Sequence, residues 1–370
     1  MKSDLQQDIK DFIDSIYPTV KGYREHLHMH PELSFEEHET MRFVCKILKE
    51  LDIPYIDKIS GTGVTAFIRG KHDANKEHVV LRGDMDALPI LEQNEVEYKS
   101  KVDGVMHACG HDVHTSNLLG VAHVLKQFES ELSHPVQLIF QPGEEKAPGG
   151  ASLLIKEKIL EHNPIKAIYG LHVFPDLPAG VVGFKEGLYM ASCDEIHIEI
   201  EGKGGHAAMP HNCIDPIQAG IQTIQNLQSQ IYRLCNPKTP MVLSFGVFEA
   251  SGATNVIPST AKIKGTFRTM DETWRALALE KMQDICDGIS QTTGAKVHLN
   301  IVKGYPYLEN HPETTKELAQ KANGLLGADK VHELPIRLTA EDFSYYTHEA
   351  PSCFFRLGVR NEEKDIVYGV

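Results

Sequence analysis

The chain has 370 residues, of which 41% are hydrophobic and 24% are charged. This composition is typical of a folded globular protein and excludes a disordered or fibrous one. A single hydrophobic core stops growing at roughly 250 to 300 residues, so two domains are expected. Asp and Glu number 51 against 37 Lys and Arg, which gives a formal net charge of −14 and argues against a nucleic-acid partner, because such partners bind to basic surfaces.

The sequence gives no sign of a membrane segment or of disulfide bonds. No stretch has the roughly 18 to 20 consecutive apolar residues that span a bilayer, and the N-terminal sequence MKSDLQQDIKDFIDSIY is charged throughout. We therefore expect a cytoplasmic protein with no membrane partner. The cysteines number seven and include no Cys-x-x-Cys pair, so neither a disulfide framework nor a zinc-finger site is indicated.

The N-terminal half alternates predicted helices and strands. Ser34 and Glu37 have the spacing of a capping box, and apolar residues then recur at helical spacing from Met41 to Leu51. Further helical patterns cover residues 118–128 and 151–159. Four apolar runs are long enough for a strand and too short for a helix, at residues 64–68, 78–81, 136–140 and 167–173. Strands separated by helices predict an α/β fold with a largely parallel sheet flanked by helices.

A different pattern begins near residue 188 and predicts a second domain. Residues 195–202 alternate apolar and polar side chains, as a half-solvated strand does. The elements that follow are a helix at 216–233, strands at 242–248 and 261–267, a helix at 272–293 and a strand at 297–302. This β-α-β-β-α-β order is ferredoxin-like. We therefore expect a large domain formed by residues 1–187 and 304–370, with an inserted ferredoxin-like α+β domain at residues 188–303.

Polar side chains gather where three of the predicted strands end. They are Arg82, Asp84 and Asp86 after the strand at 78–81, Glu144 and Glu145 after the strand at 136–140, and His172 in the strand at 167–173. A fourth cluster, MHACGHDVHT at 106–115, contributes His107, Cys109, His111, Asp112 and His114. Ligands of an open α/β sheet bind beyond the carboxyl ends of its strands, so these clusters are expected to converge on one cleft.

The residue types in these clusters are the ligands of borderline divalent metals such as zinc, cobalt or manganese. Cys109 and His111 stand two apart in a glycine-containing loop and can face one site. Of the adjacent Glu144 and Glu145, one can bind a cation while the other takes a proton from water. Taken singly, Cys109 is explained as a small buried residue, the Glu pair as a solvated face and His172 as a core histidine. Their clustering favours a metal site.

The sequence resembles one branch of the M20 metallopeptidase clan, the branch of aminoacylases, hippurate hydrolases, auxin-conjugate hydrolases and N-acetyldiaminopimelate deacetylases. The resemblance covers most of the chain in the expected order. Its motifs are REHLHMHPELSFEE at 24–37, LRGDMDALPI at 81–90, MHACGHDVHT at 106–115, FQPGEE at 140–145, GLHV at 170–173, GKGGHAAMPH at 202–211, TNVIP at 254–258, GTFR at 265–268 and AEDFS at 340–344.

The resemblance implies a role for individual residues. The large domain would be catalytic and metal-binding, and the inserted domain a lid or dimerisation domain that joins a homodimer or homotetramer. Two divalent ions per subunit, of zinc, manganese, cobalt or nickel, would be held by Cys109, His111, Glu145 and His172. Glu144 would be the general acid and base, and His206 would polarise the substrate carbonyl. The remaining roles are substrate binding by Asn255 and Arg268, and support of the metal ligands by Asp84, Asp86 and Asp112.

The implied function is metal-dependent hydrolysis of the amide bond of N-acyl, chiefly N-acetyl, amino acids, with Glu144 moving the proton of an activated water. Three alternatives stay open. One is a metallo-dipeptidase or carboxypeptidase of the same clan. Another is a non-catalytic metal-binding regulator, although the intact Glu144–Glu145 pair argues against it. The third is a hydrolase with Cys109 as its nucleophile.

One departure from the family concerns the C-terminus. Family members continue beyond a position like Gly369 into a histidine that completes the metal shell, whereas this sequence ends at Val370. Because IVYGV is strand-like, we expect an omitted tail that supplies a fifth ligand. The 370 residues alone would then bind metal weakly at one of two sites.

Overall fold

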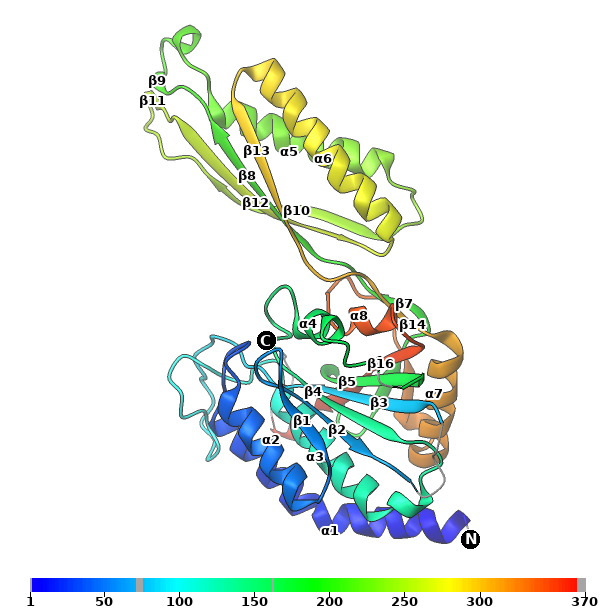
Figure 1. Cartoon of the computed structure of the whole chain (residues 1–370). Coiled ribbons are helices and arrows are strands. Elements are labelled where there is room, and N and C mark those ends of the chain that lie inside the picture. Colours follow the sequence, from blue (N-terminus) through cyan, green and yellow to red (C-terminus); the bar gives the residue numbers. More distant parts are fainter. Residues whose placement is uncertain (1, 71–75, 162, 365–370) are drawn as a thin grey trace. The chain divides into compact units, whose positions relative to one another are not determined.

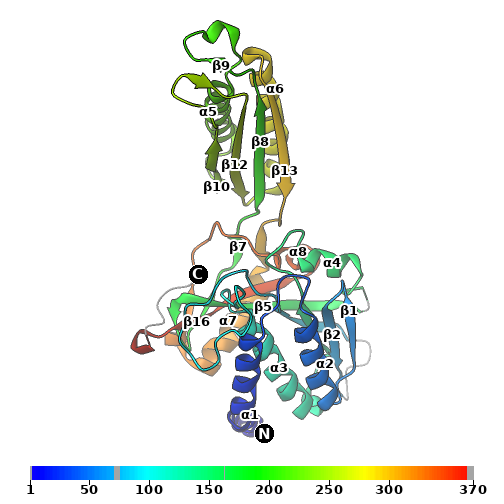
Figure 2. The same cartoon turned by 90° about the vertical axis from the view of Figure 1, so that its left-hand side faces the viewer.

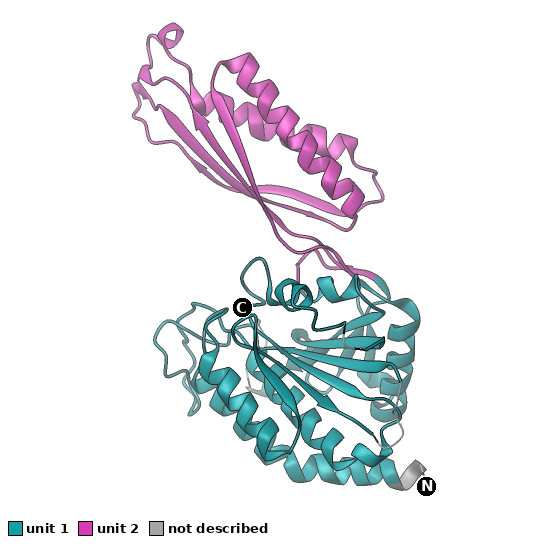
Figure 3. Ribbon diagram, in the orientation of Figure 1, with its two compact units in different colours: residues 1–187, 309–335, 342–370 teal, residues 188–308, 336–341 magenta. Residues whose placement is uncertain are grey.

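The computed structural model describes residues 2–70, 76–161 and 163–364, and the chain forms two compact units (Figure 3). Unit 1 comprises residues 1–187, 309–335 and 342–370, and unit 2 comprises residues 188–308 and 336–341. The expected terminal histidine and the IVYGV segment lie outside the described residues. Among the described helices, none combines the length and the apolar character needed to cross a membrane.

Unit 1 is built on an eight-stranded sheet with the order β1-β2-β4-β3-β5-β16-β6-β15 (Figure 1). Its centre is parallel, because β3 pairs in parallel with both β4 and β5, and β5 pairs in parallel with β16. The four strands predicted from apolar runs are β2 to β5; β2 and β4 are almost entirely buried, whereas β5 also has many partly exposed residues. The bounds are β1 Tyr55–Ile59, β2 Gly63–Ile68, β3 His78–Asp84, β4 Val136–Gln141, β5 Ile165–Pro178, β6 Val182–Phe184, β15 Val331–Glu333 and β16 Ser352–Arg360.

Helices flank this sheet, which confirms the predicted α/β class (Figures 1 and 2). The apolar stripe predicted after Glu37 forms α2 and buries Met41, Val44, Ile47 and Leu48 against the sheet. The N-terminal helix α1, which the sequence analysis did not predict, packs against α3. The bounds are α1 Lys2–Met29, α2 His38–Glu50, α3 His111–Gln127, α4 Gly150–Lys156, α7 Pro312–Leu326 and α8 Ser344–Thr347, with short 3₁₀ turns at Glu129–Glu131, Ala328–Lys330 and Glu362–Lys364.

Unit 2 has the predicted β-α-β-β-α-β order and a fully antiparallel sheet, β10-β12-β8-β13. Strand β8 alternates as predicted, with Ile196, Ile198 and Ile200 buried in the core. Asp215 and Asp271 cap the two helices through their carboxylates. The bounds are β8 Asp194–Glu201, α5 Pro216–Leu234, β10 Met241–Glu249, β12 Thr260–Thr269, α6 Glu272–Thr293 and β13 Lys296–Lys303, and shorter elements are β9 Gly205–His206, β11 Val256–Ile257 and a 3₁₀ turn at Pro210–Asn212. Strands β7 (Gly187–Met190) and β14 (Leu308–Asn310) pair where the chain passes between the units.

Residues 304–308 and 336–341 group with unit 2 in the structure, where Gly304 N–H donates to Cys193 O and Ala191 N–H donates to Thr339 O. The predicted domain bounds, 188–303 for the inserted domain, stay a prediction. The predicted Ser34–Glu37 capping box is wrong. Ser34 donates to Asp86 instead, and the first-turn N–H groups of α2 are accepted by the Glu32 carboxylate.

A buried ion pair in unit 2 gives a test of core stability. Arg275 donates to both carboxylate oxygens of Asp194 at 2.8 and 2.7 Å, and both residues are buried. We expect R275A to lower the free energy of unfolding by about 3 to 5 kcal/mol, because it leaves a buried carboxylate unpaired. The single tryptophan, Trp274, lies in the same core and reports unfolding in urea by fluorescence. The exposed Arg233 supplies the control R233A; an equal loss in both variants would contradict the prediction.

Candidate metal centre

The predicted clusters meet in unit 1, where the central strands end and α3 begins. Strands β3 and β4 are in register up to Asp84 and Gln141, so the loop carrying Glu144 and Glu145 leaves the sheet beside Asp84. His172 lies on the neighbouring strand β5. The loop before α3 adds Cys109, and His111 is the first residue of that helix. The topology thus brings together residues from four separate parts of the sequence.

The His111 ring is held so that one nitrogen is left for a cation. Its Nδ1 lies 3.2 Å from Asp86 Oδ1, and a carboxylate accepts only, so this nitrogen carries the proton. Its Nε2 is buried and has no hydrogen-bond partner among the described residues. Asp84 Oδ2 and Glu145 Oε1 lie 3.7 and 3.8 Å from that nitrogen, too far for a direct bond. A buried imidazole lone pair facing two carboxylates fits a divalent cation.

His172 is held in the same protonation pattern. Its Nδ1 lies 2.7 Å from the carbonyl oxygen of Val173, which can only accept, so the proton is again on Nδ1. Its Nε2 points to Cys109 Sγ at 3.3 Å. The ligand atoms of Cys109, His111 and His172 all lie within 4.8 Å of one another. This sulfur and nitrogen set fits zinc and its neighbours in the periodic table.

A second group shares His111 with the first. The ligand atoms of His111, Glu144 and Glu145 also lie within 4.8 Å of one another. Asp86 ties the two groups together, because its Oδ2 accepts the N–H of Glu145 at 2.9 Å while its Oδ1 faces the His111 ring. Two overlapping groups with one common histidine fit a centre that holds more than one cation.

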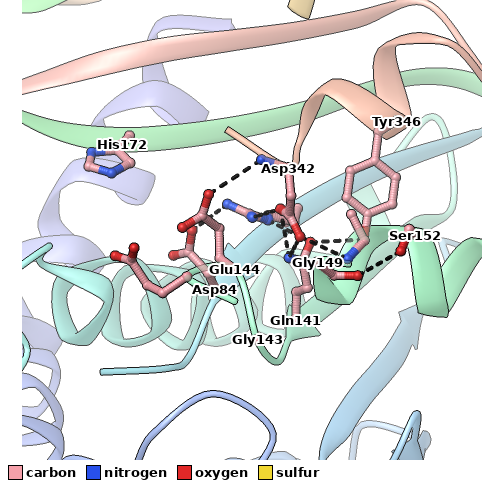
Figure 4. A network of polar contacts seen from close by, with 12 residues as sticks. Asp84, Gln141, Gly143, Glu144, Gly149, Ser152, His172, Asp342 and Tyr346 are labelled. Atoms are coloured by element: carbon pink, nitrogen blue, oxygen red, sulfur yellow. Dashed lines mark hydrogen bonds and ion pairs between the residues drawn. The ribbon is translucent and has the colours of Figure 1, made fainter. Parts of the chain in front are cut away.

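Glu144 is anchored through a buried polar network (Figure 4). Its Oε1 accepts the main-chain N–H of Asp342 at 3.3 Å. The Asp342 carboxylate in turn accepts from Gln141 Nε2 at 2.8 Å, from the N–H of Ala151 at 3.0 Å and from Arg82 at 2.7 Å. Each of these contacts is between residues of unit 1. The network holds Asp342 in place, and the main-chain N–H of Asp342 in turn holds the Glu144 carboxylate.

Comparison with known proteins identifies the family. The model of the peptidase family M20/M25/M40 matches residues 80–369. The chain belongs to this family. It is 41% identical over 350 residues to the N-acetylcysteine deacetylase of Bacillus subtilis strain 168, covering 92% of this chain and 88% of the relative. It is 36% identical over 369 residues to thermostable carboxypeptidase 2 of Saccharolobus solfataricus, covering 99% and 92%.

A solved structure supports the same assignment. The YXEP protein of Bacillus subtilis, described as a dinuclear metal-binding peptidase from the M20 family, aligns with a TM-score of 0.78 at 36% identity, covering 93% of this chain and 89% of that chain. The resemblance to M20 amidohydrolases is therefore confirmed, as are the fold class and the assignment as a hydrolase of amide bonds. Family membership also supports divalent metal ions as cofactors.

The charges of the M20 site favour a bound cation. Burial opposes ionisation of Asp84, but the adjacent Arg82 guanidinium holds the pKa of that carboxyl well below its usual range. Burial likewise opposes ionisation of Asp86, and the hydrogen bond from His111 lowers its pKa. For His111, burial disfavours the imidazolium, but the Asp84 carboxylate, the Cys109 side chain and the hydrogen bond to Asp86 together raise the pKa well above its usual range. A cation at Nε2 therefore competes with a proton, and metal binding should weaken in acid.

Asp112 lies next to His111 in sequence but faces away from the ligand groups. Its Oδ2 accepts from Arg24 Nε and His28 Nδ1, both at 2.8 Å and both from the last turns of α1. Burial opposes its ionisation, but the His28 hydrogen bond keeps its pKa below the usual range. Asp112 therefore ties the start of α3 to α1, which gives the REHLHMHPELSFEE motif a structural explanation.

The remaining predicted residues lie in unit 2. His206 is exposed on β9 and pairs with Val256 of β11, and Asn255 immediately precedes that strand. Ala207 N–H donates to the carbonyl of Asn255, so these two residues are held close together. Arg268 is half-buried on β12, where its Nε donates to Thr266 Oγ1 at 3.3 Å. The roles assigned to these residues stay predictions.

Two residues of the site had no role assigned from the sequence, although His114 belongs to the predicted cluster at 106–115. His114 contacts Asp84 and the main chain of β5, and Asp342 anchors Glu144. Both occur inside recognised motifs, MHACGHDVHT and AEDFS. Sequence alone gave no means to choose them, because their partners lie 30 to 260 residues away.

Asp86 offers a test of metal binding. We expect D86N to weaken metal affinity by about 10- to 100-fold, because the neutral amide no longer pairs with the His111 Nδ1–H as a charged acceptor. The measurement is metal content after equilibration against metal buffers. D103N, at an exposed aspartate, is the matched control. Unchanged affinity in D86N would show that Asp86 does not support the ligands.

Proposed function

We propose that this M20 hydrolase cleaves the amide bond of N-acyl amino acids, chiefly N-acetyl amino acids, and releases a carboxylate and a free amino acid. One observation carries the proposal: His111 lies within 4.8 Å of the donor atoms of Cys109 and His172 and also of carboxylate oxygens of Glu144 and Glu145, which places the Glu144 carboxylate beside the proposed ligands. The similarity to an N-acetylcysteine deacetylase supports this substrate class.

Two divalent cations per subunit, of zinc, manganese, cobalt or nickel, are proposed as cofactors, with Cys109, His111, Glu145 and His172 as their ligands. When bound, such cations polarise a carbonyl group and make water more acidic. The protein supplies the sulfur, nitrogen and oxygen donors and keeps both imidazole protons on Nδ1, away from the cations. These donors suit borderline metals better than magnesium or calcium, which prefer oxygen ligands alone.

Glu144 is proposed as the general acid and base. Its carboxylate is buried beside the ligand groups, and its Oε1 is held by the N–H of Asp342. It would accept a proton from water as the water oxygen attacks the acyl carbon. It would then return that proton to the amide nitrogen, so that the C–N bond breaks and the amine leaves neutral.

Residues of unit 2 are proposed to act on the substrate. His206 would polarise the acyl carbonyl, and Asn255 and Arg268 would bind the carboxylate of the amino acid. The Nε of Arg268 is engaged by Thr266, whereas its two terminal nitrogens have no hydrogen-bond partner among the described residues. A guanidinium with its planar end available suits a carboxylate. Assembly of a homodimer or homotetramer through unit 2 also stays a prediction.

A carboxypeptidase or dipeptidase activity is the second candidate. It is favoured by the 36% identity to thermostable carboxypeptidase 2 over nearly the whole chain. The two substrate classes share an amide bond next to a free carboxylate, and they differ only at the acyl end. The described ligand groups serve either reaction, so substrate preference must be measured.

A panel of substrates separates these candidates. We expect release of free amino acid from N-acetyl amino acids and from hippurate and N-acetyldiaminopimelate to exceed cleavage of dipeptides, as judged by kcat/KM for each compound with each metal restored. The physical reason is that an acyl group lacks the charged α-amine that a dipeptide would bring beside bound cations. A reproducible preference for dipeptides would favour the peptidase instead.

Substitution of Glu144 tests the mechanism. E144Q keeps the size of the side chain but removes its basicity, so kcat should fall about 100- to 10,000-fold while metal content stays unchanged. E97Q, at an exposed glutamate, is the control. Turnover near that of the wild type would reject Glu144 as the base, and loss of metal would instead make it a ligand.

A further inference from the structure

His114 makes two hydrogen bonds that together fix its protonation. Its side chain is buried, and its Nδ1 lies 2.5 Å from Asp84 Oδ1. Its Nε2 accepts the main-chain N–H of Val173 at 3.0 Å. A carboxylate only accepts and a main-chain N–H only donates, so Nδ1 carries the proton and Nε2 carries none. Although Asp84, His111 and His114 could together hold an ion by distance alone, the Nε2 lone pair of His114 is already used.

Val173 connects the elements of the candidate metal centre. Strand β3 pairs with β5 as far as Arg82 and Gly170, whereas β16 continues alongside β5 beyond this point. His114 therefore bonds the main chain of β5 where β3 no longer does. The carbonyl of the same residue, Val173, accepts the Nδ1–H of His172. Both main-chain polar groups of Val173 are thus bonded to histidine rings.

The Val173 side chain adds a contact with the loop that carries Cys109. Gly110, between Cys109 and His111, has a φ of +86°, and a Cβ there would come within 2.5 Å of Val173 Cγ2. Glycine therefore permits the loop to approach β5 closely. The ring of His114 also lies against that of His172, with centroids 4.7 Å apart.

We infer that His114 is a positioning residue that aims the Nε2 of His172 at the metal centre through the main chain of Val173. By bonding the Val173 N–H, it fixes the residue whose carbonyl orients the His172 ring. The inference rests on the proposed function, since it takes His172 as a metal ligand. It assigns to His114 no direct contact with metal or substrate.

Two substitutions separate the two bonds of His114. The amide nitrogen of an asparagine lies near the position of Nδ1, so H114N retains a donor to Asp84 and loses the bond to Val173. The amide oxygen of a glutamine lies near the position of Nε2, so H114Q retains an acceptor for the Val173 N–H and loses the donor to Asp84. Cobalt is titrated into the metal-stripped full chain, and the absorption of the thiolate–cobalt bond reports coordination by Cys109.

We expect H114N to bind cobalt about 10- to 100-fold more weakly than the wild type, as for other residues that orient metal ligands, and H114Q to stay closer to the wild type. Equal weakening in both variants, or none in either, would overturn the inference. H172A distinguishes failure of the proposed site: cobalt binding like that of the wild type would show that His172 is not a ligand, and both proposals would fall.

A measurement on the unaltered protein keeps the inference testable if H114N does not fold. In the metal-free wild type, nitrogen-15 NMR of the imidazoles should show His114 with its proton on Nδ1. A scalar coupling across the hydrogen bond should join the Val173 amide to His114 Nε2. The opposite tautomer, or rapid hydrogen exchange of the Val173 amide, would contradict the inference.

Discussion

The candidate metal centre depends on where the protons of two imidazoles sit. A histidine binds a cation only through an unprotonated nitrogen, so the other nitrogen must hold its proton and find an acceptor. The Nδ1–H of His111 donates to the Asp86 carboxylate, and the Nδ1–H of His172 donates to the carbonyl oxygen of Val173. Each acceptor is itself held: Asp86 by Ser34 and the N–H of Glu145, and Val173 by the His114 ring that accepts its N–H and by the pairing of β5 with β16. Hydrogen bonds within the protein thus orient both rings with Nε2 toward the proposed metal centre.

The parallel sheet explains why the polar residues of the candidate metal centre lie close together. Because β3, β4 and β5 run in the same direction, their carboxyl ends meet at one edge, and each can add a short polar segment there. The turn after β4 is tight: Gly143 has a φ of +60°, and a Cβ at this position would lie 2.3 Å from the ring of Phe35. The buried Glu37 carboxylate accepts the N–H of Gly143 at 2.8 Å. Glu144 and Glu145 therefore leave the sheet from a backbone that is held in place.

Local patterns in the sequence predicted the parts of the fold that local forces determine. Strands β2 to β5 were predicted from continuous apolar runs, which are typical of strands buried on both faces. Strand β8 was predicted from alternating apolar and polar residues, which are typical of a strand buried on one face. Both patterns can be recognised from neighbouring residues alone. Ser34 and Glu37 were misread because their partners, Asp86 and Gly143, are 52 and 106 residues away. The same limit applies to His114 and Asp342. Motifs placed them near the site, but only the folded chain shows that His114 bonds to main chain rather than to a cation.

The electrostatics also argue against Cys109 as a nucleophile. A catalytic cysteine needs a low pKa, produced by a nearby positive charge such as an imidazolium. Here burial raises the pKa of the Cys109 thiol to about 11. His172, whose Nε2 faces the sulfur, could accept the proton, but burial and the Arg356 guanidinium hold its pKa well below the usual range. A Cys109 thiolate paired with a His172 imidazolium is therefore disfavoured at both ends, and the pKa of Cys109 stays raised although the nearby His111 ring acts to lower it. At the proposed site, a divalent cation would remove the difficulty, since it would stabilise the Cys109 thiolate and would require a neutral His172.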